Sequence, residues 1–163
     1  MNGVQVRPTG PSRLSVSLVI PGRNCESTLR RCLESVDGLL DQPTARDEAK
    51  DHSCRLLEII FVNDGSTDRT AEIAAGFPVT VLTGHGQGPG SARNIGWRHA
   101  SSDLIWFIDS DCVAHADALQ ILYDEFMTAE SAGEDAPVAG IGGSYSNLFP
   151  RSLLASLIHE EIL

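Results

Sequence analysis

The chain has 163 residues, of which 42% are hydrophobic and 21% are charged, a composition typical of one soluble, globular domain with its own core. Its formal net charge is -10, which repels nucleic acid and anionic lipid, so neither is an expected partner. Lysine occurs once, at Lys50 in a polar stretch. This excludes a P-loop, because that motif requires Gly-Lys-Ser/Thr.

The predicted elements alternate between strand and helix. Short β-rich apolar runs indicate strands, and apolar residues spaced three and four apart indicate helices. In chain order we expect a strand (14–20), a helix (29–40), a polar surface loop (41–55), a strand (56–62), a short helix (66–75), a strand (79–82), a glycine-rich loop (83–90), a helix (91–100), a strand (104–108), a helix (116–129), a strand (138–141) and an amphipathic helix (146–163). Asn24 is the expected N-cap of the first helix.

This alternation predicts an α/β fold, with a mostly parallel open sheet and helices on both faces. We expect a single domain over 1–163 with its core at 14–145, and we expect it to be incomplete at its C-terminal part. Right-handed crossovers place the carboxyl ends of all strands on one edge of the sheet, where ligands bind in folds of this kind. That edge should gather the segments 21–25, 63–65 and 109–111, together with the loop 83–90 and Arg93.

The chain has four cysteines, Cys25, Cys32, Cys54 and Cys112. They form no CxxC pair, and their spacing is not that of a zinc-binding motif. Reduced, partly buried thiols are typical of a cytosolic protein. Residues 1–13 lack the apolar core of a secretory signal, and no apolar run approaches the about 18 residues of a membrane span. These features predict a cytoplasmic location, which in a full-length context could be the inner face of a membrane.

Two carboxylates, Asp109 and Asp111, directly follow a buried strand with only Ser110 between them. Two carboxylates so spaced can both face a hard cation such as Mg²⁺ or Mn²⁺. Acidic residues after strands also cap turns, but crowded like charges are costly without a counter-ion. A divalent metal here would also place positive charge where an anionic ligand binds to this acidic chain.

Two further side chains at the same edge could contact a nucleotide. Asp64 ends a buried strand, where its oxygens could accept hydrogen bonds from a nucleobase or ribose, or form an Asx-turn into the next helix. Arg93 lies in the first turn of a helix, where its forked guanidinium could reach a base or phosphate, or remain a solvated helix residue.

Two rival motifs fit less well. The glycines of 83–90 suggest a dinucleotide-binding loop, but GxGxxG fails from every starting glycine. The run from Asp109 to Val113 resembles the DxDxT/V motif of haloacid dehalogenase-type phosphatases, in which the first Asp is the nucleophile. That family usually carries the motif on its first strand and needs a downstream lysine, whereas no lysine follows Asp109 here.

With these residues in place, the chain resembles the family 2 glycosyltransferases of GT-A fold. The resemblance rests on 16–24 (VSLVIPGRN), 58–68 (EIIFVNDGSTD, close to the family's EIIVVDDGSTD), and 90–96 (GSARNIG) followed by 104–111 (LIWFIDSD). The three segments occur in the family's order. Two positions depart from the pattern: Asn63 replaces a common Asp, and the turn at 21–24 lacks the tyrosine often found before Asn24.

The resemblance implies a role for each matching residue. Asp64 resembles the carboxylate that contacts the nucleobase, and Arg93 the arginine near the base and phosphates. Asp109 resembles the member of the DxD motif near ribose and metal, and Asp111 the direct metal ligand. Pro21 and Asn24 resemble parts of the wall around base and ribose.

The implied reaction is metal-assisted transfer of a sugar, with inversion, from a nucleoside-diphosphate sugar to an unknown acceptor such as a saccharide or lipid. A UDP-sugar is the expected donor. The family's general base belongs to an acceptor half for which the chain past Asp111 is too short, so no catalytic base is identified. The alternatives are a binding module that holds a nucleotide-sugar without transferring it, or half of a split enzyme, with the apolar stripe at 153–162 facing a protein partner.

Overall fold

The computed structural model describes residues 14–40, 54–131 and 138–144. The chain divides into two compact units, Met1–Tyr123 and Asp124–Leu163, and the sheet described below lies in the first. Most of the expected polar loop (41–53) and the C-terminal amphipathic helix (146–163) fall outside the described residues. The expectation of a single domain with a core over 14–145 stays a prediction. Among the described residues, no helix has the length and apolar character needed to cross a membrane.

Four parallel strands form one sheet in the order β3-β2-β1-β4. They are β1 (Ser15–Gly22), β2 (Arg55–Asn63), β3 (Thr80–Thr83) and β4 (Leu104–Phe107). Of the central strands, β1 is buried along nearly its whole length and β2 is buried from Ile59 to Val62, because helices cover both faces of a parallel sheet and its inner strands are therefore mainly apolar. The predicted α/β class with a mostly parallel sheet is confirmed.

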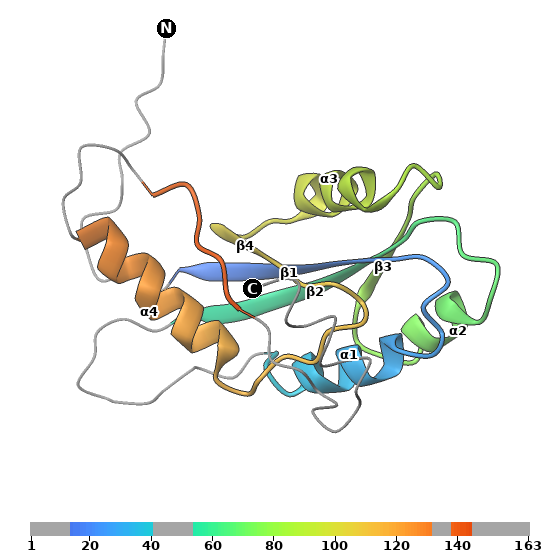
Figure 1. Ribbon diagram of the computed structural model, residues 1–163, viewed down its shortest axis with the longest axis horizontal. Coiled ribbons are helices and arrows are strands. Elements are labelled where there is room, and N and C mark those ends of the chain that lie inside the picture. Colours follow the sequence, from blue (N-terminus) through green and yellow to red (C-terminus); the bar gives the residue numbers. More distant parts are fainter. Residues whose placement is uncertain (1–13, 41–53, 132–137, 145–163) are drawn as a thin grey trace, which may run out of the picture. The chain divides into compact units, whose positions relative to one another are not determined.

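The helices are α1 (Leu29–Asp37), α2 (Thr70–Ala74), α3 (Pro89–His99) and α4 (Ala118–Ser131). Within the first unit, α3 lies on one side of the sheet and α1 on the other (Figure 1). The α3 face buries Val19, Ile60 and Val62 against Ala92. Gly96 permits this close approach, because a Cβ atom there would overlap the side chain of Val19.

Three sequence-based expectations about the elements are wrong. Residues 138–144 form no strand, because this short apolar run is interrupted by glycines that pack no side chain and weaken a strand. Asn24 does not cap α1, which begins at Leu29 after Thr28. The second helix begins at Thr70 rather than near Ser66, because residues 66–69 make polar contacts with the turn after β1 instead.

The turns that follow the four strands lie at one edge of the sheet, as parallel pairing requires. After β1 come residues 23–28, after β2 residues 64–69, after β3 residues 84–88, and after β4 residues 108–111. Segments far apart in the sequence are therefore neighbours here, which is where open α/β sheets bind their ligands.

Candidate functional site

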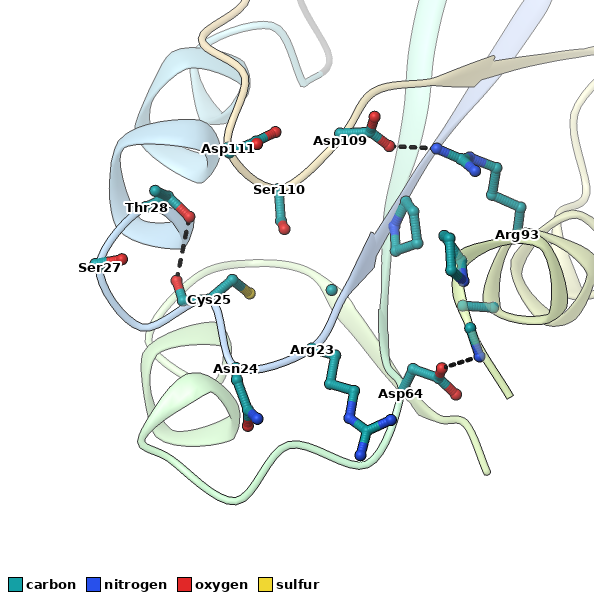
Figure 2. Close-up of a pocket in the computed structure, with 15 residues that line it drawn as sticks. Arg23, Asn24, Cys25, Ser27, Thr28, Asp64, Arg93, Asp109, Ser110 and Asp111 are labelled. Carbon is teal, nitrogen blue, oxygen red and sulfur yellow. Dashed lines mark hydrogen bonds and ion pairs between the residues drawn. The ribbon is translucent and has the colours of Figure 1, made fainter. Parts of the chain in front are cut away.

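A pocket of about 520 Å³ opens at this edge of the sheet. All six residues predicted from sequence line it: Pro21, Asn24, Asp64, Arg93, Asp109 and Asp111. Asp109, Ser110 and Asp111 lie on one side of the pocket, and Arg23 and Asp64 lie across from them (Figure 2). The fold therefore brings together the residues that the sequence predicted would converge.

Asp64 is buried, with only 3% of its surface exposed, and it holds the glycine-rich loop. Its Oδ1 accepts the backbone N–H of Gly86 and its Oδ2 that of Gly88, both at 2.8 Å. Burial alone raises the pKa of this carboxyl, but the backbone N–H groups of Gly88, Gly86 and Gln87 and the charge of Arg23 outweigh burial and lower it. Asp64 is therefore an ionised group that fixes the loop's path.

The loop can take this path because of its glycines. Gly86 and Gly88 have φ values of 70° and 93°, which residues other than glycine rarely adopt. Gly84 packs so closely on Asp64 that a Cβ atom would overlap the carboxylate. The Asx-type turn considered for Asp64 belongs to its neighbour, since Asn63 Oδ1 accepts the N–H of Ser66 at 3.0 Å.

Arg93 and Asp109 form an ion pair across the pocket, between Nη2 and Oδ1. Arg93 projects from the first turns of α3, and Asp109 follows β4. The two side chains are 34% and 47% exposed, so the pair faces the pocket and remains accessible to solvent. Arg93 is thus a partner of the acidic segment rather than a free surface arginine.

Asp111 is an exposed carboxylate of the site and makes one weak contact. In the described part of the chain its one hydrogen-bond partner is the thiol of Cys112, with Sγ 3.8 Å from Oδ1. The described residues contain no cluster of three or more His, Cys, Asp or Glu that could hold a metal ion. Mg²⁺, however, commonly binds through one or two carboxylates together with water and the phosphates of a bound substrate. The donor set of Asp111 and the second oxygen of Asp109 fits that mode.

The structure adds pocket residues that the sequence did not single out, namely Arg23, Cys25, Ser27 and Thr28. Arg23 could have been noticed, since an acidic chain that binds an anion needs cations at the site. Asn24 lines the pocket, but its side chain is engaged elsewhere, because Oδ1 accepts the N–H of Thr67 at 2.8 Å. No sequence pattern indicated that contact.

Comparisons with known proteins agree on one family. The sequence model of Glycosyl transferase family 2 matches residues 17–160. The minor teichoic acid biosynthesis protein GgaA of Bacillus subtilis (strain 168) is 34% identical over 122 residues, which cover 70% of this chain and 25% of that protein. This chain spans about a quarter or less of the length of the first curated relatives it matches.

Solved structures show the same fold. Glucosyl-3-phosphoglycerate synthase from Mycobacterium tuberculosis, crystallised with Mn²⁺, UDP and phosphoglyceric acid, is 25% identical with a TM-score of 0.58, covering 71% of this chain and 39% of that one. TarS 1-349 from S. aureus in complex with UDP-GlcNAc has a TM-score of 0.56 at 23% identity, covering 82% and 38%. The second likeness concerns the fold alone.

Proposed function

The chain belongs to glycosyl transferase family 2, and on this premise we propose that its pocket binds a nucleoside-diphosphate sugar as the donor part of an inverting, metal-assisted glycosyltransferase. One observation carries the proposal: Asp64, Arg93 and the pair Asp109 and Asp111, predicted from three separate segments, line a single pocket. A UDP-sugar is the expected donor, supported by the similar solved structure that was crystallised with Mn²⁺ and UDP.

The charges of the pocket suit a diphosphate. Arg23 and Arg93 supply two cations, and the guanidinium of arginine matches the geometry of phosphate oxygens. The pair between Arg93 and Asp109 leaves Asp111 as the carboxylate whose charge needs a counter-ion. We propose that Asp111, with the free oxygen of Asp109, holds a divalent cation, as the relative crystallised with Mn²⁺ and UDP suggests. When bound, such a cation supplies positive charge to the leaving diphosphate.

The proposed reaction breaks the bond between the anomeric carbon and the diphosphate oxygen. An acceptor hydroxyl forms the new bond from the opposite face, which inverts the anomeric centre, and its proton passes to a general base. We place that base and the acceptor site outside the residues described here. The part played by this chain is to bind and orient the donor, because the residues that line its pocket can contact base, ribose and phosphates.

Binding of nucleotides tests the proposal directly. We would titrate UDP, GDP and dTDP by calorimetry, with and without Mn²⁺, into the wild type and Asp111→Asn. One nucleotide, UDP by expectation, should bind more tightly with Mn²⁺, and Asp111→Asn should lose at least roughly tenfold in affinity, the scale of one charge-assisted contact. Asp37→Asn is the matched control, since it makes the same charge change at the end of α1, outside the pocket.

Equal binding by the wild type and Asp111→Asn, or tighter binding without metal, would contradict the assignment of Asp111. A turnover assay with the preferred UDP-sugar then separates a transferase from a module that only binds. Release of UDP supports the enzyme, and tight binding without release supports the module.

A further inference from the structure

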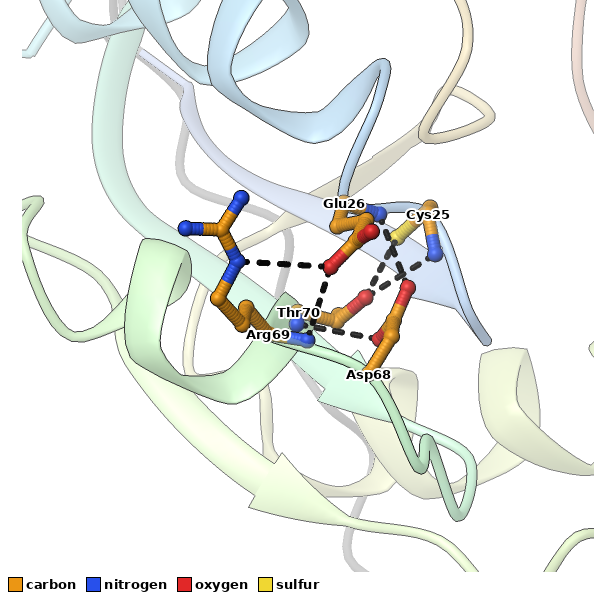
Figure 3. Close-up of polar contacts among 5 residues, drawn as sticks. All are labelled: Cys25, Glu26, Asp68, Arg69 and Thr70. Atoms are coloured by element: carbon orange, nitrogen blue, oxygen red, sulfur yellow. Dashed lines mark hydrogen bonds and ion pairs between the residues drawn. The ribbon is translucent and has the colours of Figure 1, made fainter.

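The turn after β1 forms one wall of the pocket, and it is tied to the segment after β2 by a set of polar contacts (Figure 3). We call this set the clamp, and it comprises Cys25 and Glu26 from the turn with Asp68, Arg69 and Thr70 from the neighbouring segment. We infer that Thr70, which does not line the pocket, is a positioning residue that sets the shape of the nucleotide-sugar site through Cys25. This inference rests on the function proposed above.

Thr70 makes the most buried contact of the clamp. Its side chain is fully buried, at 0% exposed, and its Oγ1 accepts the backbone N–H of Cys25 at 2.9 Å. The same hydroxyl donates to Cys25 Sγ at 3.8 Å, so its donor and an acceptor lone pair are both used. Without this hydroxyl the N–H of Cys25 would be buried and unpaired, which is far more costly than losing an exposed contact.

The outer contacts of the clamp are reciprocal but more exposed. The N–H of Glu26 donates to Asp68 Oδ2 at 3.2 Å, and the N–H of Arg69 donates to Glu26 Oε2 at 3.1 Å. The N–H of Thr70 donates to Asp68 Oδ1 at 3.0 Å. The ion pair between Arg69 and Glu26, at 3.6 Å, joins two largely exposed side chains and stabilises little. Solvent can replace the exposed contacts of Glu26 and Arg69, whereas it cannot reach the hydroxyl of Thr70.

The backbone of the turn needs such support. Asn24 has a φ of 52°, a left-handed conformation that persists in non-glycine residues only where the surroundings hold it. Residues on both sides of it, Arg23, Cys25 and Ser27, line the pocket. A turn released at Cys25 would therefore move several pocket-lining groups together, which explains how a residue outside the pocket can control affinity.

The test compares two variants of Thr70. Thr70→Val keeps the shape of the side chain and removes the hydroxyl, whereas Thr70→Ser keeps the hydroxyl. Affinity for UDP with Mn²⁺ should fall by about tenfold in Thr70→Val, the scale of losing one buried hydrogen bond, and Thr70→Ser should restore most of it. A role limited to global stability would give Thr70→Val a lower Tm but an unchanged Kd at temperatures where it is folded.

A second readout does not depend on nucleotide binding. Cys25 is 7% exposed, whereas Cys32 and Cys54 are 0% and 1% exposed, so the two buried thiols report global opening and Cys25 reports the turn. Labelling with iodoacetamide, quantified by peptide mass spectrometry, should proceed several-fold faster at Cys25 in Thr70→Val while Cys32 and Cys54 stay slow. Thr70→Ser should label Cys25 at the wild-type rate.

Selective labelling of Cys25 together with weaker UDP binding supports the inference. Unchanged labelling of Cys25 in Thr70→Val overturns it, as does parallel acceleration at all three thiols, which would make Thr70 a residue of general stability only. Selective labelling with an unchanged Kd would also overturn it, since the turn would then move without affecting the site. If the wild type binds no nucleotide, the proposed function fails, and the labelling by itself still decides whether Thr70 holds the turn.

Discussion

Replacing Asp64 by asparagine tests whether this carboxylate holds the glycine-rich loop. Its two oxygens accept the N–H groups of Gly86 and Gly88 at 2.8 Å each. The asparagine side chain would keep one oxygen as an acceptor and turn an amide NH₂ toward the other N–H. One charge-assisted hydrogen bond, worth about 1.5–3 kcal/mol, is lost, and a buried donor is left unpaired. We therefore expect the free energy of unfolding to fall by about 2–4 kcal/mol.

Urea denaturation followed by far-UV circular dichroism measures this loss, and a thermal melt should show a Tm lower by roughly 6–12 °C. Asp111→Asn is the matched control, because it makes the same substitution in the same pocket at an exposed carboxylate with no backbone N–H partner among the described residues. Its stability should stay within about 0.5 kcal/mol of the wild type. Equal stabilities for the two variants would refute the view that Asp64 organises the loop.

Gly96→Ala should destabilise the chain by about 1–3 kcal/mol, because the new Cβ atom would overlap the side chain of Val19. The control Gly90→Ala, in the same helix with open space around it, should be neutral or slightly stabilising. Unfolding of both variants at the same urea concentration would contradict the close packing of Gly96 on Val19. Lowering the pH should also weaken the fold, since backbone N–H groups hold the pKa of Asp64, and the N–H and hydroxyl of Ser15 the pKa of Asp103, below the ordinary 3.8. A carboxyl whose pKa is lower in the folded state contributes stability that is present above its unfolded pKa and is lost as the pH falls through its folded pKa. Urea midpoints measured from pH 5 to pH 2 should therefore fall most steeply below about pH 4. A flat profile in that range would contradict the lowered pKa values.

The sequence by itself determined the class of the fold and the edge of the sheet at which the candidate site residues meet. The runs 56–62 and 104–108 are nearly unbroken in apolar residues, so they predicted buried strands of a parallel sheet. That prediction holds for Ile59–Val62 in β2 but is wrong for β4, which lies at the end of the sheet order and has Phe107 42% exposed. Parallel strands end at one edge, which was enough to predict that Asp64, Arg93 and the DxD segment would meet. These features are local in origin, because periodicity and propensity act over a few residues.

Only the tertiary structure decided how the polar groups at that edge are paired. Nothing local to Asp64 says that its partners are Gly86 and Gly88, and nothing local to Asn24 says that it accepts from Thr67 rather than capping α1. A polar side chain near a turn can satisfy its hydrogen bonds within the turn or with a distant segment. Buried polar groups take whichever partners the packed chain places within reach. The choice therefore depends on which segments the sheet order β3-β2-β1-β4 brings side by side, and that order is set by the packing of the whole unit.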